Sequence, residues 1–289
     1  MTNFLKDFKT KRKDYFVIWA HSDIHPKGGD VHEEQRQQYE NAIDDMLTQS
    51  VDLVLVPGDI ALGSTAVLER GDYEWYNEQK NKFVHEAKLH FNNWMEIAGN
   101  HDNHVYEEYL KRINPELSYA RLFGNILIIA MSDEYENYSA EQELSDKTIS
   151  WWKDLVKNNQ DKIIINMTHN HALRASIFQT LRVDTILGMG IQGTRGIFYE
   201  LNRYPIDMWL NGHTHKPSWI PGTTAKDKGI IYLDTAAIRK DFWYQHVESR
   251  VIYFKKGTNE VLVRTRYHED QEYVKCLDHI YHVRNKFES

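Results

Sequence analysis

The sequence predicts an α/β fold: a layered sandwich of two mixed β-sheets flanked by helices, in the order αββα. In the first part of the chain, buried apolar runs alternate with helical patterns, which implies crossover connections whose helices cover a sheet. From residue 229 onward, strand patterns follow one another without helices, which implies a second sheet packed on the first. No linker or repeat divides the 289 residues, so we expect one domain spanning residues 15–267.

The expected strands are continuous apolar runs, often β-branched, as is typical of strands buried on both faces. They are residues 15–20, 51–56, 94–98, 126–131, 163–167, 206–210, 230–233, 251–254 and 261–265. Turn residues at 123–125 and 256–259 precede two of these strands, and the second turn predicts a hairpin.

Apolar residues at helical spacing predict helices around residues 39–47, 76–87 and 106–113. Ser145 is suited to cap a further helix. The first fourteen residues are a charged segment that we expect to be solvated. In residues 268–289, Tyr273, Leu277 and Ile280 recur at helical spacing and predict a helical tail packed on the same domain.

Composition excludes several classes of protein. A single cysteine rules out an internal disulfide and any thiolate metal cluster, whereas the chain has 15 histidines. The net charge of -7 argues against an extended nucleic-acid surface. No run of about 20 apolar residues is present, so we expect no membrane partner. The amino terminus is charged and resembles no secretory signal, so the expected location is the cytoplasm.

Five polar clusters each follow a predicted strand directly, where ligand-binding loops of α/β sheets lie. They are Ser22-Asp23-Ile24-His25, Gly58-Asp59, Gly99-Asn100-His101-Asp102, Thr168-His169-Asn170-His171 and Asn211-Gly212-His213-Thr214-His215. Carboxylate, imidazole and amide groups suit Mn, Fe or Zn. Their recurrence at five strand ends predicts one metal-binding rim.

These clusters, in this order, resemble the calcineurin-like metallophosphoesterase superfamily over about residues 15–267. The resemblance implies hydrolysis of phosphate esters at a dinuclear metal centre. One metal would take Asp23, His25, Asp59 and His215, and the other would take Asp59, Asn100, His169 and His213. Asp59 would bridge the two ions.

The resemblance also implies the catalytic groups. A hydroxide between the metals would attack phosphorus, His101 would protonate the leaving group, and Asp102 would orient His101. Mn²⁺ is the metal we expect first, with Fe, Zn or Mg as alternatives.

Two further residues are expected to bind the substrate, His171 and Arg195. His169 and His171 compete for one ligand position; His169 is nearer the strand end, which leaves His171 to contact the substrate or to support the metal ligands. Residues 187–196 hold four glycines around Arg195. This stretch is read either as a surface loop or as a loop that places Arg195 on phosphate.

The function expected from these residues is hydrolysis of a small or nucleotide-like phosphodiester. A phosphomonoesterase, acting on small molecules or proteins, is the alternative. A nuclease is disfavoured by the acidic charge, and a non-catalytic scaffold is disfavoured because every ligand and His101 are present. The expected partner is therefore a small phosphorylated substrate; the oligomeric state does not follow from the sequence.

Overall fold

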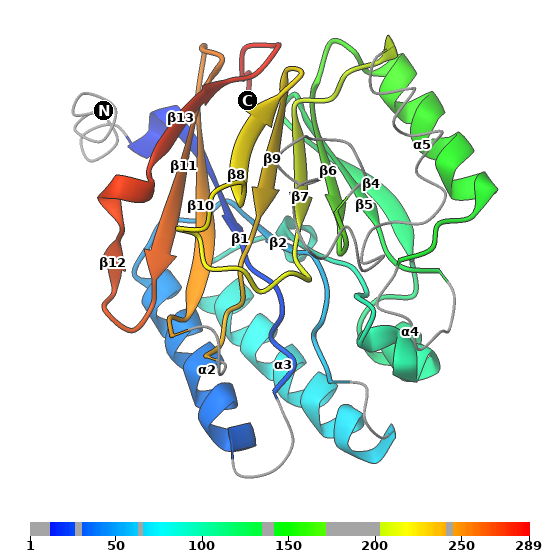
Figure 1. Ribbon diagram of the computed structural model, residues 1–289, viewed down its shortest axis with the longest axis vertical. Helices are drawn as coiled ribbons and strands as arrows, with labels where there is room; N and C mark the ends of the chain where they lie inside the picture. Colours follow the sequence, from blue (N-terminus) through cyan, green and yellow to red (C-terminus); the bar gives the residue numbers. More distant parts are fainter. Residues whose placement is uncertain (1–11, 27–30, 63–65, 135–141, 172–202, 241–244) are drawn as a thin grey trace.

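The computed structural model describes residues 12–26, 31–62, 66–134, 142–171, 203–240 and 245–289 (Figure 1). Two stacked β-sheets form the centre, and helices cover both outer faces, so the predicted αββα sandwich is confirmed. All nine predicted strands are present, most of them with shifted ends.

The first sheet has the strand order β12-β11-β10-β1-β2-β3, with β13 paired to β11. Strands β1, β2 and β3 are parallel, whereas β10 and β11 pair antiparallel on the other side of β1. The strands are β1 (Tyr15–Ala20), β2 (Leu53–Val56), β3 (Trp94–Glu96), β10 (Glu248–Lys255), β11 (Glu260–Tyr267), β12 (Glu272–Tyr273) and β13 (His279–His282).

The second sheet has the order β4-β5-β6-β7-β9-β8. Its four inner strands are parallel, and its edge strands β4 and β8 run antiparallel to their neighbours. The strands are β4 (Ser118–Phe123), β5 (Ile126–Met131), β6 (Ile163–Thr168), β7 (Met208–Asn211), β8 (Thr224–Asp227) and β9 (Ile230–Asp234).

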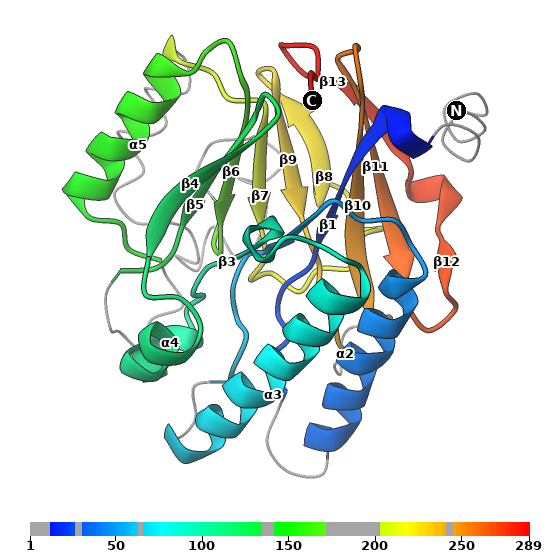
Figure 2. The ribbon, with the colours of Figure 1, turned by 180° about the vertical axis from the view of Figure 1, so that it is seen from behind.

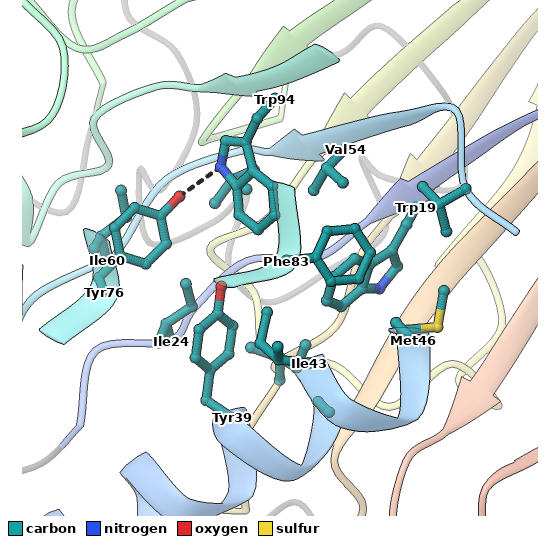
Figure 3. Close-up of a cluster of buried hydrophobic side chains, with 14 of the residues drawn as sticks. Trp19, Ile24, Tyr39, Ile43, Met46, Val54, Ile60, Tyr76, Phe83 and Trp94 are labelled. Carbon is teal, nitrogen blue, oxygen red and sulfur yellow. Dashed lines mark hydrogen bonds between the residues drawn. The ribbon is translucent and has the colours of Figure 1, made fainter. Parts of the chain in front are cut away.

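Helices α2 (His32–Leu47) and α3 (Ala66–Glu86) cover the outer face of the first sheet (Figure 2). Figure 3 shows part of this packing, in which Phe83 of α3 lies against Trp19 of β1 with 5.2 Å between the ring centroids. Tyr39 and Ile43 of α2 belong to the same buried cluster. Helix α5 (Asp146–Asn158) covers the second sheet, and its predicted N-cap Ser145 accepts the N–H of Thr148 at 3.2 Å. The shorter helix α4 (Tyr106–Arg112) packs beside the first half of α3, where Asn77 donates to the carbonyl of Arg112 at 3.0 Å. The 3-10 turns are η1 (Arg12–Asp14), η3 (Phe91–Asn93), η4 (Asp102–Val105) and η5 (Lys275–Leu277).

The inter-sheet core explains why the central strands are apolar throughout. On β5, Ile126, Ile128 and Ala130 face the other sheet, whereas the residues between them pack against α5. Both faces of the strand are therefore buried, so its residues are apolar at every position instead of alternating with polar residues. No helix in the described part of the chain is long and apolar enough to cross a membrane.

The predicted helical tail is wrong. Residues 275–277 form a 3-10 turn, while β13 pairs antiparallel with β11 so that Ile280 lies opposite Leu262. The side chains of Val283 and Phe287 reach the inter-sheet core. A free edge on β11 thus overrides the weak helical spacing, because pairing satisfies backbone groups and buries these apolar side chains. Of the charged amino-terminal segment, only the turn at Arg12–Asp14 lies among the described residues.

Candidate metal centre

The candidate site is formed by loops that leave the carboxyl ends of parallel strands in both sheets. Asp23 and His25 follow β1, Asp59 follows β2, and Asn100 follows β3. From the second sheet, His169 follows β6, and His213 and His215 follow β7. Because β1, β6 and β7 all run toward the lower part of Figure 1, their loops emerge on the same side of the sandwich.

The seven predicted ligands come together around two adjoining positions. Ligand atoms of Asp23, His25, Asp59 and His215 lie within 4.8 Å of one another, as do those of Asp59, His169 and His213. The amide of Asn100 completes the second group: its Oδ1 lies 2.8 Å from His213 Nδ1 and 3.0 Å from His169 Nε2. Asp59 belongs to both groups, in the bridging position that the resemblance implies.

The two carboxylate oxygens of Asp59 have different environments. Oδ1 accepts the backbone N–H of His101 at 2.9 Å. Oδ2 is buried without a hydrogen bond from the described residues, and it lies 3.1 Å from His169 Nε2 and 3.7 Å from His25 Nε2. An oxygen that faces one imidazole from each group is placed to be shared by two cations.

The contacts of His169 favour positive charge at this cluster. Its Nδ1 donates to the carbonyl of Pro57 at 2.7 Å, so the neutral ring presents a lone pair at Nε2. That lone pair meets acceptor oxygens of Asp59 and Asn100 at 3.1 and 3.0 Å. Although burial lowers the pKa of His169, the charges of Asp59 and Asp23 raise it to about 10. Positive charge is therefore strongly favoured at this point, and the donor set fits divalent metals.

The neighbouring ligands are held in the protonation states that metals need. Burial, and then the charge of His169, lower the pKa of His213 to about 3, so this imidazole is neutral. Burial acts to raise the pKa of Asp59, but the His169 and His101 imidazoles outweigh it and hold the carboxyl well below its usual range. The second carboxylate, Asp23, accepts the backbone N–H of His213 at 3.0 Å and the hydroxyl of Ser22.

The backbone at these positions is strained. Asp23, Asp59, His213 and His215 have φ values of 56°, 56°, 70° and 49°, in the left-handed region that side-chain-bearing residues rarely adopt. Each such residue costs about 1–3 kcal/mol, and this strain concentrates at functional sites. The surrounding fold therefore imposes the ligand geometry on the chain.

Two glycines allow the ligand loops to approach one another. A Cβ on Gly99 would overlap the Asp59 carboxylate, and a Cβ on Gly212 would overlap Ser22 Oγ and Asp23 Oδ2. Both clashes involve groups buried in the site. These glycines precede Asn100 and His213, which explains why glycine is part of both motifs.

His101 lies beside the metal ligands, with its ring stacked on that of His25 at 4.6 Å between centroids. The predicted pairing of His101 with Asp102 is not what the structure shows. Nδ1 of His101 instead donates to the carbonyl of Leu62 at 2.7 Å. Asp102 turns inward because three backbone N–H groups, at Ile60, Ala61 and Gly99, converge on its carboxylate.

Asp102 therefore organises a loop. It also accepts the hydroxyl of Tyr73 at 3.0 Å, so four donors surround a fully buried carboxylate. Burial and the charge of Asp59 nevertheless raise the pKa of Asp102 to about 7. By fixing the backbone of Ile60 and Ala61, Asp102 positions the following Leu62 carbonyl, which orients His101.

The structure describes only one of the two residues that were expected to bind the substrate. His171 is fully buried and does not belong to either group of converging ligand atoms among the described residues. Arg195 and the whole stretch 187–196 lie outside the described residues. His21, near the motifs, bonds Tyr39 at 3.1 Å in the core.

One residue beside the site was not predicted from the sequence. Arg239, which is 1% exposed, places Nη2 at 3.4 and 3.5 Å from the two ring nitrogens of His25. It follows the parallel strand β9, and its position beyond a strand end was the available signal.

The comparisons with known proteins agree with this geometry. The profile of the family described as calcineurin-like phosphoesterase matches residues 16–217, more than half of the chain. The chain belongs to this family. It is therefore a hydrolase of phosphate esters, with a candidate centre for two divalent metals.

Two solved structures share the fold. A dimetal phosphatase from Danio rerio is 10% identical, with a TM-score of 0.65 and coverage of 88% of this chain and 96% of that one. A purple acid phosphatase from yellow lupin (Lupinus luteus) seeds is 11% identical, with a TM-score of 0.61. In that case 94% of this chain aligns with 54% of the lupin protein. No curated protein matches the sequence.

Proposed function

We propose that the protein hydrolyses phosphate esters of small or nucleotide-like substrates, with two divalent metals held by the seven residues described above. The observation that carries the proposal is the position of Asp59 Oδ2, which lies between imidazoles of the two ligand groups and accepts no hydrogen bond from the described residues. Bound there, the metals would activate a water nucleophile and offset charge on the phosphoryl oxygens.

Residues of the chain supply the proton for the leaving group and hold the proton donor in place. His101 keeps Nδ1–H on the Leu62 carbonyl, which leaves Nε2 as the atom that can deliver a proton to the leaving oxygen. Asp102 supports this role indirectly through residues 60–62. We assign His101 as the general acid and Asp102 as a positioning residue.

The ester class has two candidates. The sequence favours a phosphodiester, which carries one negative charge. The buried guanidinium of Arg239 beside His25 favours the second candidate, a phosphomonoester, because its dianion matches an additional positive charge. The names of the two fold neighbours, both phosphatases, are in line with the second candidate.

The identity of the metal belongs to the same proposal. Mn²⁺ is the proposed metal because the ligands combine carboxylate, imidazole and amide groups without thiolate.

The experiment that tests the function uses metal-depleted protein with p-nitrophenyl phosphate and bis-p-nitrophenyl phosphate, with and without added Mn²⁺. We expect Mn²⁺ to restore hydrolysis of at least one ester. Absence of metal-dependent hydrolysis of both esters would refute the proposed activity. The ratio of kcat/KM for the two esters identifies the class.

A further inference from the structure

We propose that Arg239 binds the phosphoryl group of the substrate and makes the site selective for a terminal, dianionic phosphate. This inference rests on the proposed function and names the substrate class. It begins from the position of the guanidinium, whose Nη2 is 3.4 Å from Nε2 of His25. His25 belongs to the same ligand group as Asp23, Asp59 and His215.

The contact with His25 is not the usual support for a metal ligand. A ligating imidazole normally donates its second N–H to a carboxylate or carbonyl, as His169 does with Pro57. A guanidinium has only donors and cannot accept that N–H. Its presence instead adds a permanent positive charge beside the metal group, which an anionic substrate can use.

The backbone around Arg239 is fixed to the part of the fold that carries Asp23 and His25. The N–H of Ile238 donates to the carbonyl of Ser22 at 3.1 Å. On the other side, Lys240 donates its N–H to Gln38 at 2.8 Å and accepts from Gln35 at 2.9 Å. Both glutamines lie on α2. Arg239 is thus held in register with the ligand loop after β1, as a binding residue requires.

The side chain of Arg239 is as deeply buried as the predicted metal ligands. It is 1% exposed, compared with 1% for Asp59 and 2% for His25. In surroundings shielded from water, a charge-assisted hydrogen bond to phosphate is stronger than at the surface. The planar guanidinium can also contact two phosphoryl oxygens at once, which a lysine cannot.

Charge arithmetic leads from this position to the substrate class. Two divalent ions exceed the charges of Asp23 and Asp59 by two, and a hydroxide nucleophile would reduce that excess to one. Arg239 adds a further positive charge on the His25 side of the site. Positive charge added where the phosphoryl group binds favours the dianion of a phosphomonoester over the monoanion of a diester.

The test measures phosphate binding without requiring turnover. Inorganic phosphate is titrated calorimetrically into Mn²⁺-loaded wild type and into the Arg239→Gln, Arg239→Lys and Lys240→Gln variants, and Mn²⁺ per chain is measured for each. Lys240→Gln is the matched control, because it removes an equal charge from the next residue, whose side chain is 43% exposed and pairs with Glu269.

We expect Arg239→Gln to weaken phosphate binding by about tenfold or more at unchanged metal content, as loss of a charge-assisted hydrogen bond predicts. Lys240→Gln should remain within about twofold of wild type. Binding by Arg239→Gln within twofold of wild type, or loss of its metal, overturns the inference. If the glutamine variant does not fold, Arg239→Lys decides, with about threefold weaker phosphate binding expected because the planar fork is lost.

A second measurement separates this inference from the proposed function. In Arg239→Gln, kcat/KM should fall more for p-nitrophenyl phosphate than for bis-p-nitrophenyl phosphate. An equal fall for both esters contradicts selectivity for the dianion. If wild type hydrolyses neither ester, the proposed function fails, while the phosphate titration still decides whether Arg239 binds phosphate.

Discussion

The Oδ2 atom of Asp59 lies 3.1 Å from Nε2 of His169, while Oδ1 of the same carboxylate accepts the backbone N–H of His101. One side chain therefore connects both ligand groups with the loop that carries the general acid. Because the two oxygens have separate partners, replacing Oδ2 alone is expected to affect the metals before it affects the fold.

Asp59→Asn is expected to reduce bound Mn²⁺ from two ions per chain to one or none. Turnover should fall with it by about a hundredfold, since an amide is a weaker bridging ligand than a carboxylate. Elemental analysis and kcat/KM with the better ester measure both effects. The control is Asp44→Asn, at an exposed carboxylate that pairs with Lys82. Full metal content and full activity in Asp59→Asn would exclude the bridging role.

Gly99→Ala is expected to abolish high-affinity metal binding without removing any ligand. The added Cβ would overlap the Asp59 carboxylate and the Asp59 backbone N, so one of the two loops must move. Elemental analysis and thermal unfolding measure the consequences. Gly71→Ala is the matched control: it lies in α3 with its nearest neighbour 3.9 Å away, and should stabilise the protein by about 0.5–1 kcal/mol. Normal metal binding by Gly99→Ala would contradict the packing argument.

His101→Asn is expected to lower kcat in proportion to how poor the leaving group is. An alkyl phosphate needs its leaving oxygen protonated, so its rate should fall by about 10²–10⁴. p-Nitrophenolate is a good leaving group and should be affected far less. Metal content should stay unchanged. His85→Asn, at an exposed position in α3, is the control. Equal losses with both leaving groups would assign His101 a role other than proton donation.

Acid sensitivity of the fold is expected to depend on His268, which lies away from the metal ligands. Its Nδ1 is 2.8 Å from Asp45 and its Nε2 is 2.8 Å from Ser249. Burial lowers the pKa of His268, so the folded protein holds it neutral while the unfolded chain takes up a proton below about pH 6.5. Stability from this group is therefore present above that pH and lost as pH falls.

The neighbouring carboxyl of Asp45 also contributes stability that is lost as pH falls, but at lower pH. Burial acts to raise the pKa of Asp45, but Arg266 and His268 lower it overall, so its contribution is present above about pH 4 and is lost as pH falls below that value. Because His268 takes up its proton on unfolding in the range from pH 7 to 5, urea unfolding of metal-depleted protein should show a free energy of unfolding that falls over this range. In His268→Gln, this free energy should depend less steeply on pH. An identical pH dependence in the variant would show that His268 does not contribute.

Much of the site could be predicted because its residues follow strands directly. A continuous apolar run identifies a buried strand, and the end of the run places the next polar residues at the rim. This local reasoning predicted that the clusters containing Asp23, Asp59 and Asn100 share one rim, and the structure brings these residues together from β1, β2 and β3. It required no knowledge of which strands pair.

Short or polar strands could not be predicted in this way. Strand β8 has the sequence Thr-Ala-Lys-Asp, and β4 alternates only weakly. Both are edge strands whose conformation depends on one neighbour, β9 or β5. Likewise, the spacing of Tyr273, Leu277 and Ile280 favours a helix locally, but pairing of β13 with β11 decides otherwise.

The sequence by itself determined the chemical groups of this protein: carboxylates, imidazoles and an amide at five strand ends, without thiolates. Only the tertiary structure decided how they are oriented. Asp102 neighbours His101 in the chain, yet it bonds the N–H groups of residues 60 and 61. Arg239 lies far along the chain from His25, yet reaches its ring. Hydrogen-bond partners depend on which loops meet in space, and the order of residues along the chain does not specify which loops meet.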